Sequence, residues 1–211
     1  MIVRGLEVED GNGHRELKGE AELLDLQWRQ FKHDERYHRD ILSLSVADRI
    51  RHMTLHFSKY AGLLTDVCGA DDPIVERIIV DCFIIVLASA NTLNANLQRI
   101  LCIDGLSLNE FGRQSALAME RPAADHGVFW FLNQLVRHTG RMAKACESLD
   151  HLENVAFREM LVINVTQISR IVIAEAVSRG HDLEQLMLDR LDQVERKNLF
   201  WDKFVAEDHS R

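Results

Sequence analysis

Arg137, His138 and Arg141 lie close together in the segment "LVRHTGRMA". On a helix, Arg137 and Arg141 would share a face, with His138 beside them. Guanidinium groups bind phosphate and carboxylate through paired hydrogen bonds, so this set could form a pocket for an anion. A solvated basic face, or a group of salt bridges to nearby acids, is the simpler interpretation, because charged helix faces usually contact water.

His52 and His56 are four residues apart, a spacing that suits Zn²⁺ or another transition metal on one helix face. Asp81 is the third ligand that the sequence offers for such a site. The glutamate of an HExxH motif is missing, so protease chemistry has no support. A plain polar helix face explains the pair more simply, and no metal site follows from the sequence.

Asp81 interrupts the apolar segment "IIVDCFIIVLASA". A buried carboxylate is costly unless a partner compensates its charge. We therefore expect a cation beside it, with Lys59, Arg137 or Arg141 as the candidates. The alternative is that Asp81 is a remaining metal ligand.

The elements that position these groups are predicted to be helices, because the chain has 46% hydrophobic residues and only two prolines. Ser45 is placed to cap a helix, with Asp48 as its capping-box partner, and Asp182 is placed to cap the last one. Gly180 is expected to end the helix before it. The predicted helices cover about residues 16–32, 46–67, 74–93, 128–148, 152–179 and 183–205. The tryptophans of these helices, Trp28, Trp130 and Trp201, are expected in the core.

The second half of the chain repeats the pattern of the first when Gly62 is set on Gly140 and Leu97 on Leu183. We predict an all-α helical bundle with pseudo-twofold symmetry. Residues 1–13 are expected to be a flexible N-terminus and residues 14–211 a single domain. Within that domain, repeat one covers about 20–101, a connector with one short helix covers 102–127, and repeat two covers 128–205. The alternative is that two pairs of amphipathic helices match by chance.

Charge and hydropathy exclude several classes of protein. The net charge of −8 argues against nucleic-acid binding. No apolar run is expected to span a membrane, and the first residues lack the apolar core of a signal peptide. The cysteines are far apart and are expected to be buried, reduced thiols of a cytoplasmic protein; they are Cys68, Cys82, Cys102 and Cys146.

Three segments, "SVADRIRHMTLHFSKYAGLL", "HTGRMAKA" and "AEAVSRGHDLEQLMLDRLDQVERKNLFW", resemble the MazG-like family of all-α nucleoside triphosphate pyrophosphohydrolases. The resemblance implies a helical fold that assembles as dimers or tetramers. It also implies two carboxylate boxes, EExxE and ExxD, that hold Mg²⁺ while water releases pyrophosphate. Closely spaced carboxylates on one helix face suit this hard cation.

Nearly every one of these acids is replaced here. In repeat one the box positions fall on Lys59, Tyr60, Leu63, Ile78 and Asp81, and in repeat two on Arg137, His138, Arg141, Asn164 and Gln167. The family's asparagine in the last helix would fall on Val194. One aspartate cannot replace a carboxylate cage, because Mg²⁺ binds weakly without charge density.

We therefore expect a MazG-like protein with impaired catalysis, which binds a nucleotide-like or other anionic ligand or a protein partner and forms a homodimer. The ligand-binding candidates are Lys59, Tyr60, Asp81, Arg137, His138, Arg141, Asn164 and Gln167. One alternative is a divergent pyrophosphohydrolase that uses Mg²⁺. Another is a purely structural or regulatory helical module without a polar pocket.

Overall fold

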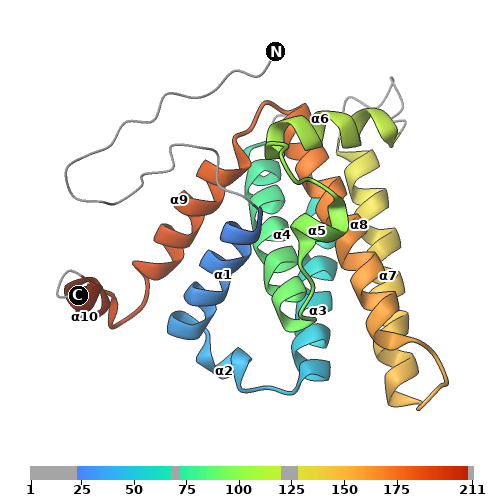
Figure 1. The fold of residues 1–211 in the computed structure, drawn as a ribbon, viewed down its shortest axis with the longest axis horizontal. Coiled ribbons are helices and arrows are strands. Elements are labelled where there is room, and N and C mark those ends of the chain that lie inside the picture. Colours follow the sequence, from blue (N-terminus) through green and yellow to red (C-terminus); the bar gives the residue numbers. More distant parts are fainter. Residues whose placement is uncertain (1–22, 68–71, 120–127, 209–211) are drawn as a thin grey trace.

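The computed structural model describes residues 23–67, 72–119 and 128–208, and every regular element among them is an α-helix (Figure 1). The predicted all-α class is therefore confirmed. The helices are α1 (Leu23–Tyr37), α2 (Arg39–Leu42), α3 (Val46–Thr65), α4 (Pro73–Thr92), α5 (Leu97–Leu101), α6 (Leu108–Ala118), α7 (Phe129–Asp150), α8 (Phe157–Ser178), α9 (Leu183–Glu195) and α10 (Trp201–Asp208). The predicted flexible segment, residues 1–13, lies outside the described residues.

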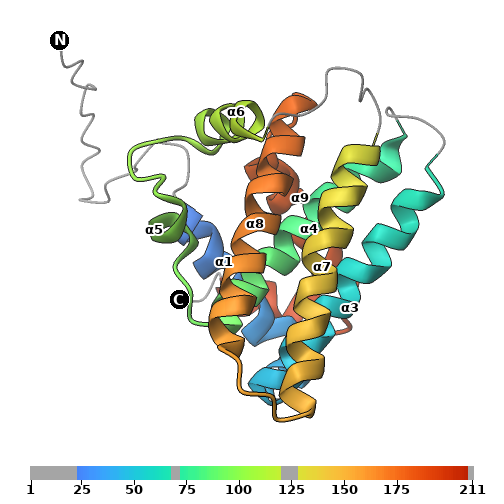
Figure 2. The same cartoon turned by 90° about the vertical axis from the view of Figure 1, so that its right-hand side faces the viewer.

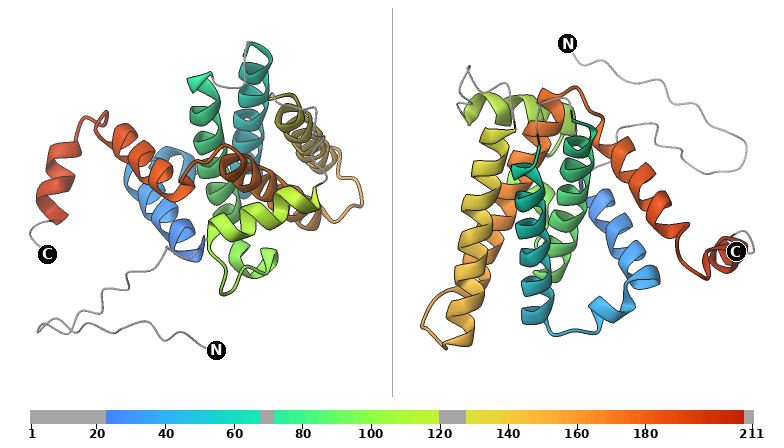
Figure 3. Two further views of the ribbon diagram at one scale, coloured as in Figure 1. Left: turned by 90° about the horizontal axis from the view of Figure 1, so that it is seen from above. Right: turned by 180° about the vertical axis from the view of Figure 1, so that it is seen from behind.

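Four long helices form the centre of the fold (Figure 2). α3 packs on α4 and α7, and α8 packs on the same two helices, so the four enclose one bundle. α1 and α9 cover another side of α4 and contact each other (Figure 3), while α6 crosses one end of α8. The sequence predicts α4 as a central helix, because its segment is apolar nearly all round.

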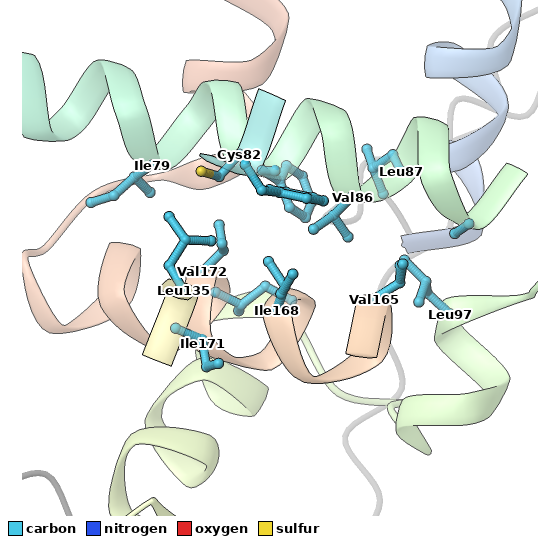
Figure 4. Packing of buried hydrophobic residues seen from close by; sticks show 14 of the residues in the cluster. Ile79, Cys82, Val86, Leu87, Leu97, Leu135, Val165, Ile168, Ile171 and Val172 are labelled. Atoms are coloured by element: carbon cyan, nitrogen blue, oxygen red, sulfur yellow. The ribbon is translucent and has the colours of Figure 1, made fainter. Parts of the chain in front are cut away.

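The contact between α4 and α8 fills the middle of the core (Figure 4). Cys82 and Val86 of α4 face Val172 and Ile168 of α8, and all four side chains are fully buried. Burying a side chain of this size contributes about 1.5–3 kcal/mol. The buried apolar residues form one cluster to which α1 and all the helices from α3 to α9 contribute.

α8 is long and apolar enough to cross a membrane, so the sequence-based expectation that no segment qualifies is wrong by length and composition. Its most apolar window has a mean hydropathy of 1.5, and 67% of that window is buried inside the bundle. The central helix of a helical bundle meets the same criterion, because neighbouring helices surround it with apolar contacts.

Polar side chains begin several helices. Ser45 Oγ accepts a hydrogen bond from the backbone N–H of Asp48 at 3.1 Å, and Asp182 caps α9 in the same way, as predicted. The predicted capping box at Asp48 is incomplete, because its carboxylate accepts from Ser45 Oγ rather than from the backbone N–H of Ser45. A complete capping box, Ser107 with Glu110, begins α6 instead.

α4 and α8 end in similar turns. Asn94 (φ 49°) and Gly180 (φ 74°) both adopt the left-handed conformation after the last helical turn. The backbone N–H of the next residue then bonds the carbonyl five residues before it, at 2.9 Å and 3.0 Å respectively. These turns fall in the register that pairs Leu97 with Leu183. The internal repeat itself stays a prediction.

Three predicted boundaries are wrong. The first helix continues through "HDERY" to Tyr37, since its apolar stripe packs on α4. α8 begins at Phe157 rather than near 152, because Leu152 (φ 53°) turns the chain and Glu153 folds back to Ser148 at 2.7 Å. The last predicted helix is divided into α9 and α10, because the Asn198 side chain accepts from a backbone N–H two residues on.

Several residues predicted to be buried are not. Trp28 is 56% exposed and stacks on Phe31 at 5.6 Å between ring centroids, whereas Trp130 is only 8% exposed, as expected. Cys82 is buried but Cys102 is exposed on a tight turn. Cys68 lies outside the described residues.

Candidate functional site

A cavity of about 320 Å³ lies between α1, α2, α3, α4 and α9. Lys59 and Tyr60 of α3 and Asp81 of α4, the candidates from repeat one, all line it. Val194 of α9 lines it as well. The cavity therefore brings together three of the ligand-binding candidates that the sequence suggests, whereas Leu63 and Ile78 do not line it.

The cavity lining carries more positive than negative groups. Four cationic side chains face two carboxyl groups, and four histidines lie among them. The cations are Arg49, Lys59, Arg77 and Arg190, the acids are Asp34 and Asp81, and the histidines are His33, His38, His52 and His56. This excess of cations contrasts with the net charge of −8 of the whole chain.

Asp81 is held by Arg190, which is not among the partners predicted from the sequence. Arg190 Nε of α9 lies 2.6 Å from Asp81 Oδ1, and Arg190 Nη2 lies 3.3 Å from Oδ2. The Asp81 side chain is 13% exposed. The prediction of a partnered carboxylate is thus confirmed. The three predicted partners, Lys59, Arg137 and Arg141, are wrong. α9 packs on α4 and supplies Arg190, and Arg77 of α4 itself lies 3.9 Å from Asp81 Oδ2.

A row of polar side chains follows α3 into the cavity. His52 Nε2 and His56 Nε2 are 3.1 Å apart, and Lys59 Nζ lies 3.2 Å from His56 Nδ1. Burial lowers the pKa of His56 to about 4, and the neighbouring charges of Lys59 and His52 add to the effect. Burial, together with the negative charge of Asp81, raises the pKa of Tyr60. His56 is thus neutral at pH 7, which leaves Lys59 as the charged group of this row.

The end of α1 brings a second polar group to the cavity. His33 Nδ1 lies 2.9 Å from Glu195 Oε1 of α9, and Gln30 Nε2 donates to Asp34 Oδ1 at 2.9 Å. Burial raises the pKa of Asp34 to about 7, although the Gln30 hydrogen bond opposes this shift. Burial and the charge of His33 lower the pKa of His38.

Sequence reasoning missed this group. The polar segment "HDERYHRD" is typical of a loop or a short helix, and only its repeated histidine and aspartate indicate a possible site. Among the described residues, only His33, Asp34 and His38 bring three potential metal-ligand atoms within 4.8 Å of one another. The predicted combination of His52, His56 and Asp81 does not form such a group, and Arg190 occupies the carboxylate of Asp81.

The candidates from repeat two lie outside the cavity. Arg137 and Arg141 are exposed on α7. His138 is buried with its Nδ1 2.9 Å from Asn164 Oδ1, and Asn164 also donates to a backbone carbonyl of α8. Burial lowers the pKa of His138. Gln167 is half-buried on α8. His138 and Asn164 thus make a hydrogen bond between two core helices.

Comparison of the chain with protein-family models, with curated proteins and with solved structures finds no match.

Proposed function

We propose that this protein binds a small, anionic, nucleotide-like ligand in the cavity beside α3 and α4, on a MazG-type scaffold without the metal-dependent hydrolysis of that family. One observation carries the proposal: the cavity at the first acid-box position is lined by an excess of cations in an acidic protein. Enclosed walls of one charge sign raise the local concentration of ligands of the opposite sign.

Two cationic groups are available to such a ligand. Lys59 Nζ is exposed and contacts only His56 Nδ1 and the Tyr60 ring among the described residues. Arg49 Nε is buried and has no hydrogen-bond partner within the part of the chain that the structure describes. A buried, unpaired donor is costly, and an anion in the cavity would satisfy it.

The cavity also suits the remainder of a nucleotide-like molecule. Its volume of about 320 Å³ is at the lower end of the range for small-molecule pockets. Apolar side chains such as Met53, Ile84 and Ile85 line it together with the amide of Asn91. Apolar walls with a few polar groups provide contacts for a base and fix its orientation.

The same cavity gives no support to metal-dependent hydrolysis by the acid boxes. Of the positions that the resemblance assigns to carboxylates in repeat one, only Asp81 is acidic, and Arg190 neutralises it. Ile78 is 1% exposed in the apolar core. Mg²⁺ requires several oxygen ligands in octahedral geometry, which this arrangement does not supply.

Titration with a panel of nucleoside mono-, di- and triphosphates in EDTA, followed by calorimetry, tests the proposal. We expect at least one nucleotide to bind, and Lys59→Ala to weaken it about tenfold, which corresponds to about 1.4 kcal/mol. Arg137→Ala is the matched control, because it removes an exposed cation from α7 outside the cavity and should leave the affinity unchanged.

Absence of binding across the panel, or equal loss in both variants, would contradict the proposal. A parallel assay for pyrophosphate release with Mg²⁺ or Mn²⁺ separates binding from catalysis. We expect no release. Release that is abolished by Asp81→Ala would favour the divergent enzyme instead.

A further inference from the structure

We propose that His33, Asp34 and His38 form a binding site for a divalent transition metal, with Zn²⁺ as the ion that their chemistry fits best. The site lies on α1 and the residue after it, apart from the acid-box positions on α3 and α4. It goes beyond the proposed binding of an anionic ligand and does not depend on it.

The three side chains already converge. Their ligand atoms lie within 4.8 Å of one another. In a tetrahedral zinc site with Zn–N distances of about 2.0–2.1 Å, neighbouring ligand atoms are about 3.3–3.5 Å apart. Small side-chain rotations would close this difference. The chain leaves the helix at Tyr37, and the backbone N–H of His38 still bonds the carbonyl of Asp34 at 2.9 Å, which keeps His38 over the last turn.

Glu195 holds His33 in a suitable orientation for coordination. The His33 side chain is 4% exposed, and its Nδ1 lies 2.9 Å from Glu195 Oε1 of α9. A carboxylate that accepts from Nδ1–H fixes the tautomer in which Nε2 carries the lone pair. Histidines that bind metals commonly have such a carboxylate partner.

Asp34 lacks a cation in the structure as it stands. Its carboxyl group is half-buried and, among the described residues, receives a side-chain hydrogen bond from Gln30 and forms no ion pair. A partly buried carboxylate is stabilised by a cation or by metal coordination. The choice of ion follows from the donors, since two imidazoles and one carboxylate suit Zn²⁺, whereas Mg²⁺ prefers oxygen ligands alone.

The three residues line the cavity, so a coordination position would face open space. Zinc sites with three protein ligands keep their fourth position for water or another small ligand. A Zn²⁺ ion with one carboxylate ligand retains one positive charge, which would also attract an anion.

Calorimetric titration of the full chain, without a histidine tag and after EDTA treatment, with ZnCl₂ tests this site. We expect one equivalent to bind, His38→Ala and Asp34→Asn each to weaken binding by more than about 100-fold, and Glu195→Gln to weaken it by about 10- to 100-fold. His151→Ala removes an exposed histidine after α7 and should bind as the unmodified chain does. Far-UV circular dichroism shows whether each variant is folded.

Co²⁺ in place of Zn²⁺ gives a second readout. Visible absorption bands of a tetrahedral ion without a thiolate charge-transfer band are expected, and they should be lost in the folded His38→Ala variant. A charge-transfer band, or loss of binding in Cys102→Ser, would assign the metal to a thiol. No binding by the unmodified chain, or binding that is lost in His52→Ala and retained in His38→Ala, would overturn the proposal.

Discussion

The ion pair between Asp81 and Arg190 changes the role that Asp81 can have. An aspartate in the middle of a helix bundle is a potential metal ligand, but the guanidinium of Arg190, 2.6 Å away, occupies the carboxylate oxygens of Asp81. A buried ion pair is costly to break, because the remaining charge is left uncompensated. Asp81 is therefore a structural anchor between α4 and α9. Among the described residues that line the cavity, Lys59, which is exposed, and Arg49, whose Nε has no hydrogen-bond partner, stay available to a ligand.

The lowered pKa of His56, about 4, makes a prediction about pH and stability. The folded protein takes up this proton less readily than the unfolded chain does, whose histidines titrate near pH 6.5. Stability from this group is therefore complete above about pH 6.5 and is lost as the pH falls toward 4. Between pH 8 and pH 5, the free energy of unfolding should therefore fall less in His56→Asn than in the unmodified chain. The difference should be about 1 kcal/mol after allowance for solvent screening.

Urea unfolding at the two pH values measures this difference. His151→Asn, at an exposed position, is the control and should keep the pH dependence of the unmodified chain. An unchanged pH dependence in His56→Asn would contradict the prediction.

At the scale of elements, glycines differ in whether they allow two helices to approach closely, and the sequence does not distinguish them. Gly62 and Gly140 suggest a repeated small-residue step, yet a Cβ atom at either position would meet no atom within 4 Å. Gly112 of α6 does carry a close contact. A Cβ atom there would lie 2.5 Å from Val177 Cγ2 and 3.1 Å from the Ile173 carbonyl of α8.

The different surroundings of Gly112 and Gly140 predict that a glycine-to-alanine substitution changes the free energy of unfolding in opposite directions at the two positions. Gly112→Ala should lower the unfolding free energy by about 1–3 kcal/mol, because α6 must move away from α8. Gly140→Ala should raise it by about 0.5–1 kcal/mol, since alanine in an exposed helix loses less backbone entropy than glycine. Thermal unfolding of both variants decides the matter, and a destabilised Gly140→Ala would show that α7 makes a contact at this face.

For the whole molecule, the core connects both halves of the chain. The contact of α4 with α8 joins the two predicted repeats, and the same apolar cluster extends to α1 and α9. Helices that share one core are expected to unfold together. A single domain of this kind is therefore expected to unfold in one cooperative transition.

Urea unfolding should give one transition, with the same midpoint by far-UV circular dichroism and by tryptophan fluorescence. Trp28 on α1 and Trp130 on α7 report from opposite halves of the chain. A Trp28→Phe variant, which leaves Trp130 in the bundle and Trp201 on α10 as the reporters, should show the same midpoint within error. Two separated transitions would instead show that the repeats fold as independent units.

Sequence reasoning succeeded where local physics decides. Helix periodicity and capping residues such as Ser45 and Asp182 act over a few residues, so the helical class and most helix starts follow from the chain alone. It failed at the ends of α1 and α9, where packing on α4 and the local turn at Asn198 compete with periodicity.

The candidate site was only partly visible in the sequence. Lys59, Tyr60 and Asp81 were identified from their place in a pattern, and all three face one cavity. The sequence by itself thus determined most of the helices, the caps at Ser45 and Asp182, and the scarcity of acids at the positions where the resemblance would require them. Only the tertiary structure decided that Arg190 neutralises Asp81 and that Glu195 orients His33, because these partners are 109 and 162 residues apart and meet through the packing of α9.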